Sequence, residues 1–122
     1  MKACVIGLGK IGLPLAVHFA KNGLEVIGVD INAHTVKLIN SGKEPFPGEE
    51  NLEEFLGEVL RDQKFSATTN FSEAVKSANT IVVLVPLVVN VDSKPDFNSI
   101  DLATNEIGKN LQKGKNLIFN VY

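Results

Sequence analysis

A glycine-rich turn near the start of the chain limits its possible folds more than any other segment: residues 5–30 read VIGLGKIGLPLAVHFAKNGLEVIGVD. Gly7, Gly9 and Gly12 form the pattern GxGxxG directly after an apolar run that predicts a buried strand. In this setting the first glycine permits a tight turn, the second lets the backbone approach a pyrophosphate, and the third lets the helix pack closely on the strand. The unpaired N–H groups of the helix's first turn then face the negative charge.

Asp30 ends the next apolar run, near the offset of about 20 residues at which a carboxylate hydrogen-bonds the adenosine ribose of a dinucleotide. This carboxylate would repel a 2′-phosphate, and no arginine follows it nearby, so the sequence favours NAD over NADP. The candidate cofactor contacts are the whole loop and the residues around the carboxylate: Gly7, Leu8, Gly9, Lys10, Ile11, Gly12, Asp30 and Ile31. The alternative is that the glycines serve only the turn and that Asp30 caps the next helix.

Strand and helix patterns alternate along the chain, which is typical of a parallel sheet covered on both faces. We expect strands at 2–6, 25–29, 64–68, 80–85 and 116–121, and helices at about 11–22, 33–41, 52–60, 71–78 and 100–111. Gly23, Gly42 and Gly114 are placed to end three of these helices. Because crossovers are right-handed, the pattern predicts an α/β fold: a Rossmann-type doubly wound parallel sheet of order 3-2-1-4-5, with helices on both faces, in a single domain over residues 1–122.

Two tetrads of the form Asn-x-x-Glu, at 51–54 and 70–73, have the spacing of a helix capping box. Pro86 cannot donate to a central ladder, so the strand at 80–85 should end there. The segment 87–97 reads as a loop that is long for a compact domain, and such loops are often functional.

Charge and composition exclude several kinds of partner. The net charge is −2 with no basic face, so neither nucleic acid nor an anionic membrane surface is expected as a partner. The apolar runs are shorter than the roughly 20 residues that span a bilayer, and we expect a cytoplasmic protein. His18 and His34 have no partners at metal-ligand spacing, and Cys4 is expected to be a buried small hydrophobe, so we expect no metal site. A group of glutamates near the helix at 52–60 is expected to be solvated: Glu49, Glu50, Glu53 and Glu54.

The chain as a whole resembles the NAD-binding domain of the UDP-glucose/GDP-mannose dehydrogenases, which are nucleotide-sugar 6-dehydrogenases. The resemblance rests on VIGLGKIGLPLAVHFAKNGLEVIGVDIN, EENLEEFL, ATTNFSEAVKSANTIVVLVP and PDFNSIDLA. It implies that the three glycines hold the pyrophosphate of NAD, that Asp30 holds the adenosine ribose, and that Val85 and Pro86 line the cofactor cleft. Within the family, the subgroup acting on UDP-N-acetylhexosamines such as UDP-N-acetylmannosamine looks most similar.

The sequence departs from the family pattern in three places. It reads VPLV where the family has VPTP, so Leu87 replaces a small polar residue, and EENLEEFL lacks the family's proline-glycine pair. It reads FNVY where the family has EST followed by VPPGT. The resemblance therefore covers the first of three family domains, without the central dimerisation domain and the nucleotide-sugar domain.

Family members oxidise a primary alcohol of the sugar to a carboxylate in two hydride transfers, with two NAD and a thioester on a catalytic cysteine, assisted by a lysine and water. Both residues lie downstream of the matching segment, and Cys4 does not correspond to the catalytic position. The resemblance thus implies a chain that binds NAD weakly and has no turnover alone. A UDP-sugar substrate and a homodimer are expected only with the other domains.

Three alternatives remain open from the sequence. A β-hydroxyacid-type dehydrogenase shares GLGxxG, although PDFNSIDLA and the helix at 52–60 argue against it. A nucleotide-sensing regulatory domain of a potassium-transport system opens similarly, but commonly has a Gly-Asp turn where this chain has SATTN at 66–70. The third alternative is a vestigial fold that binds no nucleotide and serves assembly.

Overall fold

The computed structural model describes residues 2–46, 51–85, 88–89, 95–96 and 116–121. The strands are β1 (Lys2–Ile6), β2 (Glu25–Val29), β3 (Phe65–Thr68), β4 (Thr80–Val85), β5 (Val88–Val89), β6 (Pro95–Asp96) and β7 (Asn116–Val121). The helices are α1 (Gly12–Lys21), α2 (Ala33–Asn40), α3 (Leu52–Arg61) and α4 (Phe71–Ser77). Four strands have the predicted bounds, whereas β3 begins one residue later than expected.

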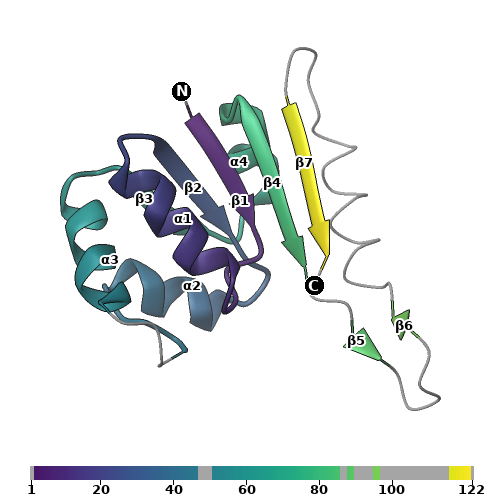
Figure 1. Cartoon of the computed structure of the whole chain (residues 1–122), viewed down its shortest axis with the longest axis horizontal. Coiled ribbons are helices and arrows are strands. Elements are labelled where there is room, and N and C mark those ends of the chain that lie inside the picture. Colours follow the sequence, from purple (N-terminus) through teal and green to yellow (C-terminus); the bar gives the residue numbers. More distant parts are fainter. Residues whose placement is uncertain (1, 47–50, 86–87, 90–94, 97–115, 122) are drawn as a thin grey trace.

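The main sheet has the order β3-β2-β1-β4-β7, and each neighbouring pair is parallel. Its arrows point the same way in Figure 1, with β1 at the centre. Since β7 is the fifth strand of this sheet, the predicted order 3-2-1-4-5 is confirmed. The order reverses on the two sides of β1, which is where doubly wound sheets bind ligands.

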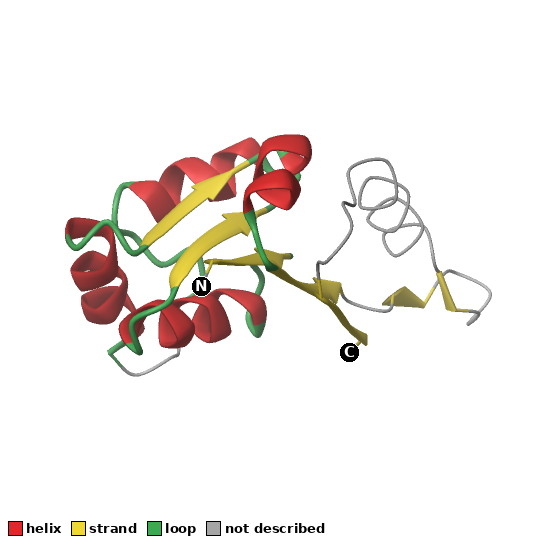
Figure 2. Ribbon diagram, turned by 90° about the horizontal axis from the view of Figure 1, so that it is seen from above, coloured by secondary structure: helices red, strands yellow, loops and turns green. Residues whose placement is uncertain are grey.

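Helices cover both faces of the sheet, as expected (Figure 2). Alternate residues of β1 show the division: Ala3 and Val5 pack in one core with α1, α2 and α3, while Cys4 and Ile6 pack in the other with α4. Cys4 is fully buried, as its place in an apolar strand predicted. The sheet is therefore packed between two layers of helices.

Three helices end in the same hydrogen-bonded turn. Gly23 and Gly42 have φ of 99° and 86°, and their N–H groups donate to Ala20 and Ile39 after α1 and α2. These glycines therefore end the helices as predicted. After α3 the same left-handed position is taken by Gln63, with φ 57°, although no glycine marks this helix end.

The two Asn-x-x-Glu tetrads differ in structure. The Asn70 side chain accepts from the Glu73 N–H at 3.1 Å, so it caps α4 as predicted. The prediction for the other tetrad was wrong: Asn51 has a left-handed backbone, φ 63° and ψ 7°, and its side chain makes no cap hydrogen bond. At the start of α3, the Glu53 carboxylate instead accepts a hydrogen bond from the Glu44 N–H at 3.1 Å.

The segment expected to be a loop contains regular structure in its described residues. β5 and β6 pair antiparallel as a separate two-stranded sheet, Val88 with Asp96 and Val89 with Pro95. The prediction of a loop over 87–97 was therefore wrong at the paired positions. The helix expected at 100–111 and its end at Gly114 lie outside the described residues.

The outer edge of β3 is held by a side chain of α2. The Asn40 amide donates to the Ala67 carbonyl at 2.8 Å, and its oxygen accepts from the Ala67 N–H at 2.9 Å. One side chain thus satisfies both backbone groups of an edge residue, where a neighbouring strand would otherwise pair.

Candidate functional site

Gly7 is the point at which the chain leaves β1 and turns towards α1. Its φ is 99°, a region that residues with a side chain rarely adopt, and a Cβ here would overlap the carbonyl oxygen of Leu84 in β4. Its N–H donates to Val29 at the end of β2, at 2.8 Å. The expectation that the first glycine permits the tight turn is borne out by this geometry.

Gly12 begins α1 directly against that turn. A Cβ at this position would overlap the carbonyl oxygen of Gly7, so only glycine lets the helix approach so closely. Pro14 lies in the first turn of α1, where proline is tolerated. The loop and the helix start therefore form one compact unit above β1.

The middle of the loop presents backbone donors. Within the described ranges, the N–H groups of Gly9, Lys10 and Ile11 donate to no acceptor of the protein. The first turn of α1 contains no acidic side chain, and Lys10 is exposed beside it. Free donors, the positive end of the helix dipole and a nearby ammonium group together suit a negatively charged group such as a pyrophosphate.

Asp30 follows β2 and joins the loop to the start of α2. One carboxylate oxygen accepts from the Leu8 N–H at 3.0 Å, and the other accepts from the Asn32 N–H at 2.9 Å. The residue that caps α2 is Asn32, whose side chain accepts from the Thr35 N–H at 3.1 Å. The alternative that Asp30 merely caps this helix is therefore wrong, and the carboxylate sits directly beside the glycine loop.

Two large apolar side chains are exposed at the same edge of the sheet. Ile31, next to Asp30, is 76% exposed, and Ile11, at the start of α1, is 45% exposed. Their exposure contrasts with Leu8, which is fully buried. A flat apolar group could cover either isoleucine.

The remaining candidates lie at the end of β4. The pairing of β4 with β1 stops at Val83, but its pairing with β7 continues to Val85, so the strands diverge at this edge. The backbone of Val85 thus lies at the same edge of the sheet as the glycine loop. Pro86 lies outside the described residues.

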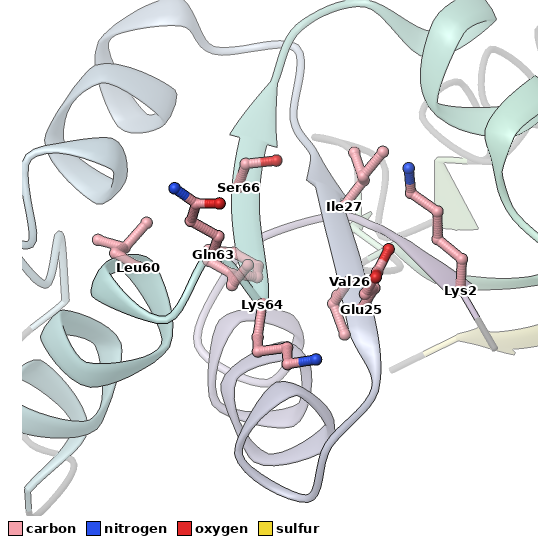
Figure 3. A pocket seen from close by; sticks show the side chains of 9 residues that line it. Lys2, Glu25, Val26, Ile27, Leu60, Gln63, Lys64 and Ser66 are labelled. Atoms are coloured by element: carbon pink, nitrogen blue, oxygen red, sulfur yellow. The ribbon is translucent and has the colours of Figure 1, made fainter.

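A pocket of about 380 Å³ lies at the opposite edge of the sheet (Figure 3). It is lined by residues of β1, β2 and β3, of the end of α3 and of the turn between α3 and β3: Lys2, Glu25, Val26, Ile27, Leu60, Gln63, Lys64, Phe65 and Ser66. None of these belongs to the glycine loop. Ligands of doubly wound sheets bind at the carboxyl ends of the strands, whereas this pocket lies at their amino ends.

Other functional features are absent from the described part of the chain. No group of three or more His, Cys, Asp or Glu side chains there converges as a metal site requires, and His18 and His34 are both exposed. None of the helices in the same ranges has the length and apolar content that crossing a bilayer requires. One residue near the loop was missed by the sequence analysis: Gly28, in the middle of β2, lies against the side chain of Leu8.

Comparison with known proteins identifies the family that this chain matches. Residues 1–120 match the UDP-glucose/GDP-mannose dehydrogenase family, NAD binding domain. The UDP-N-acetyl-D-mannosamine dehydrogenase of Campylobacter jejuni is 40% identical over 118 residues, which are 96% of this chain and 28% of that protein.

Solved structures agree with the sequence comparison. A ternary complex of GDP-mannose dehydrogenase from Pseudomonas aeruginosa superposes with a TM-score of 0.93 and 28% identity, over 99% of this chain. The UDP-D-ManNAc dehydrogenase of Pyrococcus horikoshii superposes with a TM-score of 0.92 and 32% identity, also over 99%. The chain spans 28% of the length of each of these relatives. These matches favour the family over the hydroxyacid-type and nucleotide-sensing alternatives, and the chain belongs to the UDP-glucose/GDP-mannose dehydrogenase family as its NAD-binding domain.

Proposed function

We propose that the glycine loop binds the pyrophosphate of NAD and that Asp30 accepts a hydroxyl hydrogen bond from the adenosine ribose. The observation on which this rests is the contact between the Asp30 carboxylate and the Leu8 N–H, because it places the two groups side by side. A carboxylate has about four acceptor positions, and the two backbone N–H groups occupy two of them. The remaining positions are free for a ribose hydroxyl.

The other candidates have roles that follow from their places. Lys10 adds positive charge beside the pyrophosphate, and Ile11 and Ile31 offer exposed apolar surface to the adenosine. Val85 and Pro86 are proposed to line the cleft on the β4 side. All of these residues bind and orient the cofactor, and NAD supplies the hydride acceptor.

For the whole protein we propose an NAD-dependent 6-dehydrogenase of nucleotide sugars, which oxidises a C6 alcohol to a carboxylate. The likeness to the Campylobacter jejuni UDP-N-acetyl-D-mannosamine dehydrogenase supports a UDP-N-acetylhexosamine as the substrate. A cytoplasmic homodimer is proposed with it. Cys4 takes no part in the chemistry of this proposal, because a fully buried thiol in β1 has no access to a substrate.

Calorimetric titration with NAD, NADP and ADP tests the cofactor site. We expect NAD to bind more tightly than NADP, because the Asp30 carboxylate repels a 2′-phosphate. Asp30→Ala should weaken NAD binding by about 10-fold or more, the equivalent of one hydrogen bond to a charged group, and should remove the preference over NADP. Asp62→Ala, at the exposed end of α3, is the matched control and should bind as the unchanged protein does.

Two results would contradict the proposal. If the whole protein binds none of the three nucleotides, the glycine loop is only a turn and the fold serves assembly. If NAD binds but Asp30→Ala and Asp62→Ala behave alike, the ribose is held elsewhere.

A further inference from the structure

The side chain of Leu8, between the first two glycines of the loop, points into the protein and is fully buried. It lies above Gly28 in β2: a Cβ at Gly28 would be 2.8 Å from both Cδ atoms of Leu8 and 3.2 Å from Cε1 of Phe65. Contacts below 3.0 Å do not occur between well-packed carbon atoms, so the missing side chain at Gly28 is what leaves space for the leucine.

The need for glycine at this place comes from space and not from the backbone. Gly28 is a regular member of the parallel sheet, paired with Val5 of β1 and Ala67 of β3. A glycine in the interior of a strand weakens the strand and often marks a close approach of another segment. Here the approaching segment is the glycine loop.

Leu8 is therefore held at two points, by its side chain and by its backbone N–H. Its methyl groups occupy the gap above Gly28, and its N–H donates to the carboxylate of Asp30, the residue that follows β2. The N–H groups of Gly9, Lys10 and Ile11 follow immediately and have no acceptor within the described ranges. Their position above the sheet thus depends on how deeply Leu8 is inserted.

We propose that Gly28 is a positioning residue for the cofactor: by admitting the Leu8 side chain, it sets the place of the backbone donors that hold the pyrophosphate. This inference rests on the proposed NAD site at the glycine loop. Gly28 itself is buried and acts through Leu8, without touching the ligand.

The test is made on the whole protein: side-chain volume is added at Gly28 and removed at Leu8. Gly28→Ala should push Leu8 outward and weaken NAD binding by about 10-fold or more, as the loss of one charge-assisted hydrogen bond would. Leu8→Val removes the two Cδ atoms with which the new methyl group would collide. The double variant Gly28→Ala with Leu8→Val restores the total volume closely and should recover most of the affinity.

The control is Gly57→Ala in α3, where the nearest heavy atom to an added Cβ is an Arg61 nitrogen at an ordinary 3.6 Å. It should leave NAD affinity unchanged. Melting temperatures of all variants identify those that are folded at the temperature of the titration. Should Gly28→Ala alone not fold, Leu8→Val is compared with the double variant, and the added alanine should then tighten NAD binding.

The outcomes separate this inference from the proposed function. Absence of NAD binding by the unchanged protein overturns both. If that protein binds NAD and a folded Gly28→Ala variant binds it equally well, Gly28 has no positioning role. A loss of affinity that Leu8→Val fails to restore also overturns the inference, because the effect would not then pass through Leu8.

Discussion

Gln63 occupies the left-handed position that Gly23 and Gly42 occupy after the other two helices. Its N–H donates to Leu60 at 3.1 Å, and the next N–H, of Lys64, donates to Val59 at 2.9 Å, so the turn is complete despite the side chain. A residue with a Cβ costs about 1–2 kcal/mol in this conformation. The turn is therefore maintained by its hydrogen bonds against a local preference.

Gln63→Gly is expected to increase the free energy of unfolding by about 1 kcal/mol, because glycine adopts this φ without a steric penalty. Urea denaturation of the purified protein measures the difference. Gln63→Ala is the matched control, since alanine keeps the Cβ and should give no such gain. Equal stability of the glycine and alanine variants would show that the φ of 57° carries no cost.

At the scale of elements, the tetrads at 51–54 and 70–73 show why the same letters fold differently. A capping asparagine needs an extended backbone, and Asn70 has one, with φ −88° and ψ 93°. Asn51 enters α3 from a left-handed conformation, and its side chain makes no cap hydrogen bond. Asparagine is suited to both conformations, so the letter alone does not decide between them.

Asn70→Ala should lower the free energy of unfolding by about 1 kcal/mol, the usual cost of losing a helix cap. Asn51→Gly should cause no loss, because its side chain accepts no cap hydrogen bond and glycine tolerates the left-handed backbone. Thermal or urea denaturation of the two variants gives the comparison. A loss at position 51 as large as that at position 70 would mean that Asn51 caps α3 in solution.

Much of the fold was predictable because its elements carry local signals. The apolar runs of β1, β2 and β4 are bounded by glycine, proline or polar residues, and the predicted bounds of these strands are confirmed. The glycine turn and the nearby carboxylate were found the same way. What could not be predicted depends on contacts between distant residues: Asn40 reaches Ala67 across 27 positions, and Gly28 is needed because Leu8 packs on it. No local pattern encodes such contacts.

In the whole molecule, β1 is the central strand of the main sheet, paired with β2 and β4, and four of its five residues are buried. β3 lies at the end of the sheet and pairs with β2 alone among the strands. Opening of β1 requires both neighbouring ladders to break, whereas β3 can open at its free side.

Amide hydrogen exchange should therefore be slowest in β1 and β4 and faster in β3, except at Ala67, whose N–H is held by Asn40. Mass spectrometry of exchanged peptides, or NMR of single amides, measures the gradient. The corresponding amide of Asn40→Ala provides the control, since the Ala67 N–H loses its acceptor in that variant and should exchange faster than in the unchanged protein. Protection in β3 equal to that in β1 would contradict the expected order of opening.

The central place of β1 also determines the order in which the nascent chain can fold. The unit β1-α1-β2, with its glycine turn, is complete once the ribosome has released residue 30. The Asp30 carboxylate can then accept its hydrogen bond from the Leu8 N–H. The other ladder of β1 has to wait for Thr80–Val83, about fifty residues of synthesis later. During that interval the apolar edge of the first strand is open, and the small unit that already contains the glycine turn is the part of the domain able to form first.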